Sequence, residues 1–401
     1  MSATKRILFV DDDPLLLQGL RRMLHPWRHE WEMEFVESGE QALSRLGDKP
    51  FNVVVSDMRM PGMNGVELLE QVKARHPQTV RIILSGHADQ ELILRSVSVA
   101  HQYLSKPCDP EALKNAVASA TRLASTVQND QLLRLVSQME RLPSLPAFYK
   151  ELVGLLSNPE VSMDQVGEVI ARDIAMTAQI LKVVNSSFFG LRRQISSAAE
   201  AASYLGADIL RSLVLSLNAF SQFQGAKAGG LCPEALWSHS LQVGLAAKLV
   251  AQAERTRVQM AEDSFVSGLL HDTGKLVLAS YFPREYTLTC QAAVERGLAA
   301  CQAERETFGC NHAEVGGYLL GLWGLPAQVV DAVNLHHAPS TSPLREFTPL
   351  TAVHVADALA HQIGLADQAG PGRPQVDTNY LAGLGLADRW PVWEAVVKRG
   401  F

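Results

Sequence analysis

One stretch indicates the fold of the first part of this chain: Asn52-Val-Val-Val-Ser-Asp57-Met-Arg-Met-Pro61. The valine run is typical of a buried strand in a parallel sheet, which is apolar on both faces. Asp57 falls where the strand gives way to a loop, so we expect its carboxylate at the carboxyl edge of the sheet, where open α/β folds build their sites. Taken alone, the spacing of Asp57 and Pro61 also fits ordinary turn chemistry.

Further predicted strands end on polar side chains in the same way. Lys5–Val10 is followed by Asp11, Asp12 and Asp13, Val80–Leu84 by Ser85, and His101–Leu104 by Ser105, Lys106 and Pro107. Parallel strands would bring Asp11 and Asp12 beside Asp57, and crowded carboxylates repel one another unless a hard cation such as Mg²⁺ lies among them. A helix cap is the alternative, and it accounts for one acid only. Acids, a hydroxyl and an amine together are what an aspartyl-phosphate requires.

With these elements in order, residues 5–122 resemble the receiver domain of bacterial two-component response regulators. The resemblance implies a multidomain chain whose N-terminal part is a flavodoxin-like α/β domain with a doubly wound parallel sheet, and a sensor histidine kinase as phosphoryl donor. Asp57 would be the phosphoacceptor. Ser85 and Lys106 would contact the phosphoryl group, and Tyr103 would be the aromatic switch. Mg²⁺ would be held by Asp11, Asp12, Asp57 and the backbone carbonyl of Arg59.

Length and composition set the broad class. The chain has 401 residues, which favours two or three domains, and 47% of them are hydrophobic. No window is long and apolar enough for a membrane span, and five widely spaced cysteines fit a reducing compartment, so a cytoplasmic protein is expected. The net charge of -6 without a dense basic run disfavours direct DNA binding.

Residues 110–139 contain no internal glycine or proline and predict one long helix, of which residues 123–141 would link two domains. Leu113, Val117, Ala120, Ala124 and Val127 form a short heptad seam. Up to Ala120 we favour packing on the receiver's own sheet. Beyond Ala124, pairing of two subunits into a homodimer is the second interpretation.

From residue 142 to about 365 the pattern is almost wholly helical, and residues 366–401 form a small C-terminal helical segment. This part carries a series of imidazoles and carboxylates: His239, His271, Asp272, His312, His336, His337 and Asp357. Such groups, converging from several helices of a bundle, can form a metal site. Any single histidine is more often a surface or core residue, and we interpret His354 and His361 in that way.

The order of these residues, after Leu142-Pro-Ser-Leu-Pro146, Asp173 and Tyr204-Leu-Gly206, resembles the HDOD family of all-α signalling output domains. Its relatives, the HD phosphohydrolases and HD-GYP cyclic di-GMP phosphodiesterases, bind metal at such positions: His239, His271, Asp272 and Asp357, with His312, His336 and His337 for additional ions. Two features depart from the HD-GYP pattern. Ala338-Pro-Ser follows His337 in place of Gly-Tyr-Pro, and Ala235 replaces an acid one turn before His239.

Two functions therefore remain open. In the first, the chain is a response regulator in which phosphorylation of Asp57 controls an HDOD domain that acts through an unidentified protein partner. In the second, the HDOD domain is a metal-dependent phosphohydrolase or cyclic dinucleotide phosphodiesterase gated by the same switch. We favour the first, in which His239 to Asp357 are packing and hydrogen-bonding residues, and expect no hydrolysis of phosphodiesters. If His239, His271, Asp272 and Asp357 converge, the domain would retain a transition metal without turnover.

Overall fold

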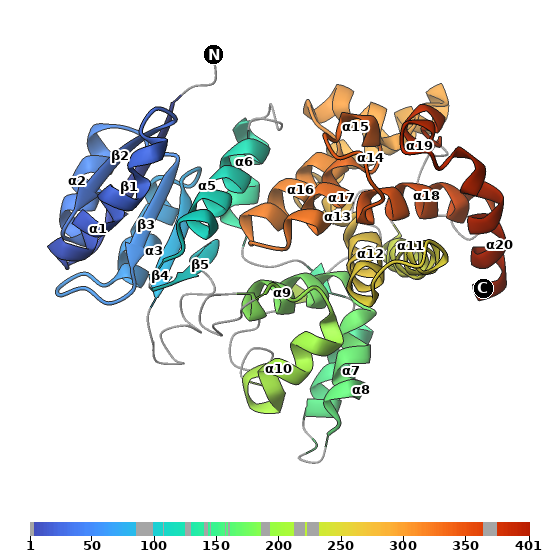
Figure 1. Cartoon of the computed structure of the whole chain (residues 1–401), viewed down its shortest axis with the longest axis horizontal. Helices are drawn as coiled ribbons and strands as arrows, with labels where there is room; N and C mark the ends of the chain where they lie inside the picture. The colour runs from blue at the N-terminus through green and yellow to red at the C-terminus, as the bar shows by residue number, and fades with distance from the viewer. Residues whose placement is uncertain are drawn as a thin grey trace.

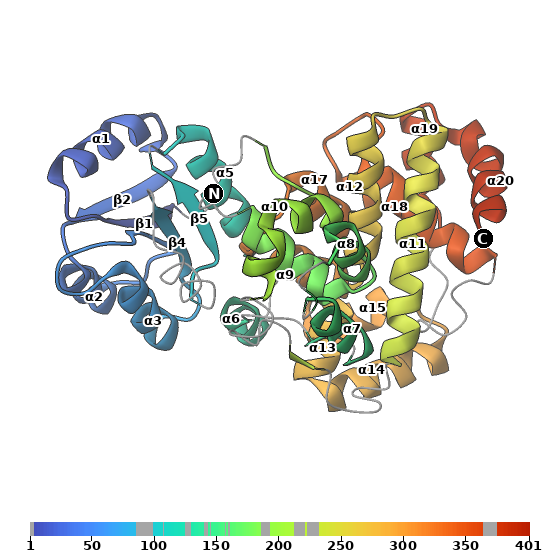
Figure 2. The same ribbon diagram turned by 90° about the horizontal axis from the view of Figure 1, so that it is seen from below.

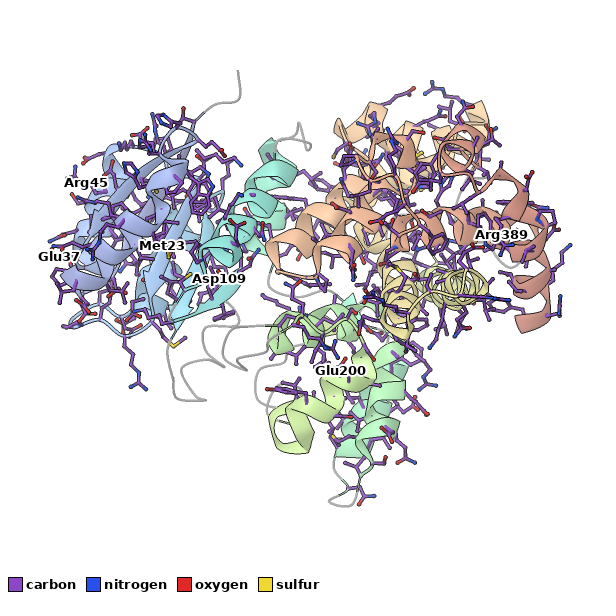
Figure 3. All side chains as sticks on the ribbon, in the orientation of Figure 1. Met23, Glu37, Arg45, Asp109, Glu200 and Arg389 are labelled. Atoms are coloured by element: carbon purple, nitrogen blue, oxygen red, sulfur yellow. The ribbon has the colours of Figure 1, made fainter. Side chains whose placement is uncertain are left out.

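The computed structural model describes residues 4–85, 99–106, 108–124, 130–139, 143–144, 146–156, 158, 161–185, 193–211, 221–222, 232–363 and 375–401. A sheet flanked by helices forms one end of the molecule and a large helical part forms the other (Figures 1 and 2). Glu37 and Arg45 lie on the side of the sheet region that faces away from the large helical part (Figure 3). None of the described helices is long and apolar enough to cross a bilayer.

The sheet is fully parallel, with strand order β2-β1-β3-β4-β5. Its strands are β1 (Lys5–Val10), β2 (Trp31–Val36), β3 (Val53–Asp57), β4 (Val80–Ser85) and β5 (Gln102–Ser105). The helices of this region are α1 (Pro14–Leu24), the short 3-10 helix η1 (His25–Trp27), α2 (Gly39–Asp48), α3 (Gly65–Arg75) and α5 (Pro110–Ala124). The doubly wound α/β fold expected from the sequence is thus confirmed.

The four strands predicted to end on polar residues are all present, within one residue of their expected bounds. All five residues of β3 are buried, as the valine run predicts. The strand β2 was not singled out, because its sequence Trp-Glu-Met-Glu-Phe-Val carries no site residue and two exposed or half-buried acids. It lies at the edge of the sheet, where it pairs with one neighbouring strand, β1.

The single long helix predicted over residues 110–139 is wrong. The chain forms two helices there, α5 and α6 (Asp130–Gln138), which lie along different directions (Figures 1 and 2). Residues 125–129 between them are outside the described part. Leu113, Val117, Leu132 and Met139 are buried within the chain's own core, so they are not exposed for pairing with a second subunit. The side chains of Ala120 and Ala124, and Val127, lie outside the described part, so a homodimer through this segment stays a prediction.

The remainder is helical apart from one short parallel pair, β6 (Pro143–Ser144) with β7 (Ser221–Gln222), which the sequence analysis did not expect. The helices are α7 (Pro146–Leu156), α8 (Met163–Ala171), α9 (Ile174–Val184), α10 (Ala198–Arg211), α11 (Pro233–Ala253), α12 (Val258–Leu270), α13 (Thr273–Tyr281), α14 (Pro283–Arg296), α15 (Ala300–Phe308), α16 (His312–Leu322), α17 (Ala327–Leu335), α18 (Pro349–Gln362), α19 (Thr378–Gly383) and α20 (Trp390–Gly400), with 3-10 helices η5 (Pro339–Thr341) and η6 (Ala387–Arg389). Gly206 has a φ of 74° and interrupts α10.

Two cores hold the helical part together. Residues of α8, α9, α12, α13 and α16 join one apolar cluster that continues into the sheet region through Leu113 and Val117 of α5. The second cluster joins α11 and α18 to the C-terminal helices through Tyr380, Trp393 and Val397. The segment 375–401 therefore packs on the helical bundle.

The sheet region and the helical part meet at α16, which packs against both α5 and α6. Gln102, the first residue of β5, donates a hydrogen bond of 2.8 Å from Nε2 to the backbone oxygen of Gly321, near the end of α16. Arg81 of β4 donates from its guanidinium to Ser137 O, 2.8 Å away, and His101 Nε2 lies 2.8 Å from the same oxygen. These contacts join two strands of the sheet to helices outside it.

Candidate functional sites

The strand register brings the predicted receiver residues together at the carboxyl edge of the sheet. Val10 pairs with Ser56, so the residues that follow them, Asp11 and Asp57, lie side by side. Ser85 pairs with Ser105 at the ends of β4 and β5, and Lys106 follows directly. This edge is where parallel strands offer side chains to a site.

Lys106 connects the two carboxylates. Its Nζ lies 2.6 Å from Asp11 Oδ2 and also forms an ion pair with Asp57 Oδ1. Burial alone would lower the pKa of Lys106, but the two carboxylates raise it above its ordinary value. Burial raises the pKa of Asp57, and the proximity of Asp11 adds to this, while Lys106 opposes it. The edge therefore holds a buried nucleophilic carboxylate beside a fixed positive charge.

The remaining predicted receiver residues take different positions. Asp12 is exposed, next to Asp11 at the end of β1. Tyr103 is buried in β5. Arg59 N donates a hydrogen bond of 2.9 Å to Asp57 Oδ2. Ser85 ends β4, but its side chain is outside the described part, as is Pro107.

The helix-cap alternative applies to Asp13 and not to the other acids. Asp13 is the N-cap of α1 and accepts from Leu15 N at 2.8 Å. Asp11 Oδ1 accepts from Asp13 N at 3.0 Å, which holds the turn after β1. Asp11 and Asp12 are thus left for other roles at the sheet edge.

A close backbone contact fixes the loop after Asp57. Gly65, the first residue of α3, donates from N to Met58 O at 3.0 Å. A Cβ added at Gly65 would lie 2.0 Å from the backbone oxygen of Asp57. No side chain fits in that space, so glycine at this position allows α3 to begin directly against the end of β3 at Asp57.

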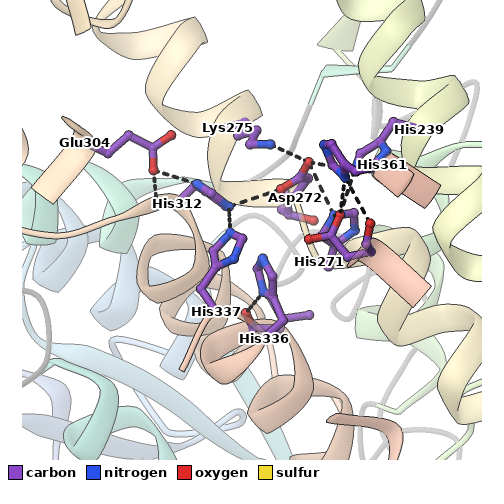
Figure 4. Close-up of polar contacts among 12 residues, drawn as sticks. His239, His271, Asp272, Lys275, Glu304, His312, His336, His337 and His361 are labelled. Carbon is purple, nitrogen blue, oxygen red and sulfur yellow. Dashed lines mark hydrogen bonds and ion pairs between the residues drawn. The ribbon is translucent and has the colours of Figure 1, made fainter. Parts of the chain in front are cut away.

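The histidines and aspartates predicted to form a metal site come from five segments of the helical part. His239 lies within α11, the pair His271 and Asp272 between α12 and α13, His312 at the start of α16, the pair His336 and His337 just after α17, and Asp357 within α18. Figure 4 shows these side chains converging. All seven residues predicted from the sequence belong to this one cluster, which we call the histidine cluster.

A glycine makes the cluster compact. A Cβ at Gly274, early in α13, would lie 1.9 Å from the backbone oxygen of His312. Only glycine permits α13 and α16 to approach this closely. The approach places Asp272 Oδ1 3.2 Å from His312 Nε2.

Three imidazoles share one tautomer. The Nδ1 of His271 lies 2.7 Å from Gly268 O, that of His336 lies 2.7 Å from Val333 O, and that of His312 lies 2.6 Å from Glu304 Oε2. Because these oxygens only accept, each Nδ1 carries a proton and donates it. In the neutral ring each Nε2 is then an acceptor, as in histidines that ligate metals.

The protonation states of the cluster are those expected of metal ligands rather than of salt-bridged pairs. Burial lowers the pKa of His271 to about 4 and that of His337 to about 3, and it holds the pKa of His336 well below its ordinary value. Burial alone would raise the pKa of Asp272 and Asp357. His271 and Lys275 hold the pKa of Asp272 well below its usual range, and contacts with His239 and His361 do the same for Asp357. At neutral pH the site thus contains neutral imidazoles beside carboxylates.

His312 is the exception. Burial alone would lower its pKa, but Glu304 and Asp272 raise it to about 9. In the metal-free protein His312 is therefore an imidazolium that supplies one positive charge to the cluster.

Several buried polar atoms in the cluster have no hydrogen-bond partner among the residues that the structure describes. They are both ring nitrogens of His239, Oδ1 of Asp272, Nε2 of His336 and Oδ1 of Asp357. Buried acceptors that face one another are costly unless a cation lies between them. The donor atoms also fall into three overlapping groups, each within 4.8 Å: His312, His336 and His337; His239, His271 and Asp357; and His271, Asp272 and His336. This mixture of imidazole and carboxylate fits a divalent transition metal.

Three polar residues adjoin the cluster that the sequence analysis did not select. Lys275 Nζ lies 2.7 Å from Asp272 Oδ2, and Glu304 holds His312 as described above. His361, which we interpreted as a surface or core residue, has Nδ1 3.3 Å from Asp357 Oδ1. This contact is compatible with a core residue that does not ligate metal, and the spacing of four residues between Asp357 and His361 is the sequence signal for it, since such residues share a helix face. Glu304 lies on a different helix and gives no such signal.

His354 takes the structural role expected for it. Its Nδ1 lies 2.8 Å from His336 O, and its Nε2 accepts from Asp377 N at 2.9 Å. Both ring nitrogens are used in joining α18 to the segments on either side.

The chain has a parallel-sheet domain with acidic side chains at its carboxyl edge, followed by a helical domain with a histidine cluster. This arrangement is that of a two-component response regulator. The chain belongs to the response regulators that carry an HDOD domain: the response regulator receiver domain matches residues 7–118 and the HDOD domain residues 142–339. The chain thus contains both domains in the order that the sequence motifs suggest.

Similar curated proteins include an uncharacterized protein of Treponema pallidum, 27% identical over 54% of this chain and 41% of that protein. The hydrogenase transcriptional regulatory protein HoxA of Cupriavidus necator is 34% identical over 41% of this chain and 36% of that protein. This chain spans less than half the length of these relatives. Since HoxA is named as a transcriptional regulator, the expected lack of direct DNA binding stays a prediction.

Two solved structures are also similar. The MmoQ response regulator from Methylococcus capsulatus is 28% identical, with a TM-score of 0.47 over 64% of this chain and 98% of that chain. An HDOD domain protein of unknown function from Geobacter sulfurreducens is 25% identical, with a TM-score of 0.39 over 72% of this chain and 94% of that chain.

Proposed function

We propose that this response regulator accepts a phosphoryl group on Asp57 and that the state of Asp57 controls the HDOD domain, which acts on a protein partner. A receiver domain implies a sensor kinase as the donor. The observation that carries the proposal is the shared ion pair of Lys106 with Asp57 and Asp11 at the end of β5, the strand whose first residue contacts the helical part.

The geometry suits phosphoryl transfer. An oxygen of the Asp57 carboxylate attacks phosphorus, and the bond from phosphorus to the donor's nitrogen or oxygen breaks, leaving its electron pair on the donor. Lys106 stabilises the negative charge of the phosphoryl oxygens. Asp11, Asp12, Asp57 and the carbonyl of Arg59 would hold Mg²⁺, which offsets the repulsion between the carboxylates and the incoming phosphate.

The route to the HDOD domain follows β5 and α16. A single strand of four residues separates Lys106, at the phosphoryl site, from the Gln102 contact with Gly321. Gly321 lies nine residues after His312 in α16, so the helix extends about 14 Å from that contact to the histidine cluster. A shift of β5 after phosphorylation would therefore displace an element that contributes directly to the cluster.

The test of phosphorylation uses acetyl phosphate with Mg²⁺ on the full-length protein. We expect a label on the wild type, no label on Asp57→Asn, and a normal label on the control Asp48→Asn, since Asp48 is an exposed residue of α2. An acid-stable, base-labile adduct that persists in Asp57→Asn would contradict the assignment.

A second candidate function, a metal-dependent phosphohydrolase, is favoured by the converging imidazoles and carboxylates. A bound ion would supply a Lewis acid and an activated water. His239, His271, Asp272 and Asp357 would hold one ion and His312, His336 and His337 another. Against turnover, the exposed fraction is at most 1% for His271, Asp272, His312 and His336, so a phosphate ester does not reach them in this conformation.

The two functions are separated by an assay of cyclic di-GMP and simple phosphodiester hydrolysis with Mn²⁺ or Fe²⁺ added. We expect metal retention without turnover. Metal-dependent turnover by the wild type that is lost in both His271→Ala and Asp272→Ala would identify the HDOD domain as a phosphohydrolase.

A further inference from the structure

His361 lies on the outer side of the histidine cluster, one helical turn after Asp357 on α18. Its side chain is 15% exposed, whereas the side chains of Asp357 and His239 are 5% and 2% exposed. Its Nδ1 lies 3.0 Å from the backbone oxygen of Asp357 and 3.3 Å from Asp357 Oδ1. The carbonyl only accepts, so Nδ1 carries the proton and the positive edge of the ring faces both oxygens.

Asp357 Oδ1 is the oxygen that faces the cluster. It lies 3.3 Å from His239 Nε2 and 3.9 Å from His271 Nε2. The ring of His361 also packs edge-on against that of His239, with centroids 5.1 Å apart (Figure 4). On α11, the position one turn before His239 is Ala235, which offers no polar atom, whereas Asp357 and His361 of α18 both lie beside His239.

We infer that His361 is a positioning residue that orients the Asp357 carboxylate and the His239 ring for metal, an inference that rests on the proposal that the histidine cluster binds metal. His361 does not ligate the ion. Its Nδ1–H donates to the backbone oxygen of Asp357, and the positive edge of the ring, 3.3 Å from Oδ1, favours the rotamer that turns Oδ1 toward His239 and His271. Its ring packs edge-on against that of His239. Partners of this kind, one step removed from the ion, set metal affinity about 10- to 100-fold.

The test strips the full-length protein with a chelator and titrates Co²⁺ into the wild type, His361→Ala, His361→Asn and the control Gln362→Ala. Gln362 is the next residue of α18 and is exposed. Asparagine is the conservative variant because its amide N–H can donate from nearly the position of Nδ1. Affinity, the visible spectrum of bound Co²⁺ and the melting temperature of the metal-free protein are measured.

We expect His361→Ala to bind Co²⁺ about 10- to 100-fold more weakly, with a metal-free melting temperature like that of Gln362→Ala. We expect His361→Asn to recover most of the affinity with the wild-type spectrum. Wild-type affinity in His361→Ala would overturn the inference alone, and an altered spectrum in His361→Asn would make His361 a ligand and overturn its positioning role. A wild type that binds no Co²⁺ would instead remove the metal proposal on which the inference rests.

Discussion

At the scale of single residues, the two sites balance the charges of their crowded polar groups in different ways. At the sheet edge the carboxylates of Asp11 and Asp57 share the ammonium group of Lys106. In the histidine cluster most imidazoles are neutral, and Lys275 and His312 supply the positive charge beside Asp272. The first arrangement leaves a nucleophilic carboxylate in place, and the second leaves lone pairs for a metal.

The close contact at Gly65 predicts a sharp effect on Asp57. Gly65→Ala would force the backbone oxygen of Asp57 to move, and a misplacement of about 1 Å at a reacting group can cost on the order of 100-fold in rate. We expect a corresponding drop in acetyl phosphate labelling. Gly47→Ala on α2, where an added Cβ meets nothing within 4 Å, is the control. Equal labelling rates for the two variants would show that the contact does not position Asp57.

Lys182 of α9 predicts a pH dependence of stability. It is 4% exposed, its Nζ lies 5.1 Å from the ring centroid of Trp323, and burial, with Arg81 and Lys73 nearby, lowers its pKa from 10.5 to about 7. Between these values the unfolded chain binds a proton that the folded chain does not, so Lys182 makes stability rise with pH from about 7 to 10.5. Below about 7 its penalty is complete.

Denaturant midpoints across this pH range check the sign. Lys182→Met should be more stable than the wild type at neutral pH, and the difference should shrink as the pH approaches 10. Lys398→Met, on the exposed end of α20, should show no such trend. A difference that grows with pH would contradict the assignment.

At the scale of elements, the sequence reveals the strands better than the connections between them. Asp57, Ser85 and Lys106 could be predicted because each directly follows an apolar strand, and parallel strands align their carboxyl ends. The break between α5 and α6 could not, because no glycine or proline marks it and the packing of both helices on α16 decides their directions. The cluster histidines were found from their order, whereas Glu304 and His361 became visible only through packing.

The contact between β5 and α16 predicts a measurable cost. Gln102→Leu removes the hydrogen bond from Gln102 Nε2 to the backbone oxygen of Gly321, which still accepts from Gly324 N at 3.1 Å, and the loss of one such bond costs about 0.5–1.5 kcal/mol. Urea unfolding should show this loss, and labelling of Asp57 should be unchanged. Gln362→Leu on the exposed face of α18 is the control. A loss no larger than that of the control would mean that the contact contributes little.

At the scale of the whole molecule, one apolar core runs from the sheet region through α5 into the helical part. The two domains therefore share buried surface rather than being joined by a tether alone, and α16 lies between the sheet region and the other helices (Figure 1). A change at Asp57 that displaces β5 would reach α16 through the contact of Gln102 with Gly321. The same helix begins at His312 in the histidine cluster. We therefore expect phosphorylation of Asp57 to be coupled to a change in α16.

The most direct measurement is hydrogen exchange of the α16 amides, residues 312–322, in the full-length protein with Mg²⁺, with and without acetyl phosphate. We predict that exchange in this segment changes on phosphorylation of the wild type and stays constant in Asp57→Asn. Exchange that stays constant across residues 312–322 while Asp57 is demonstrably labelled would contradict the coupling.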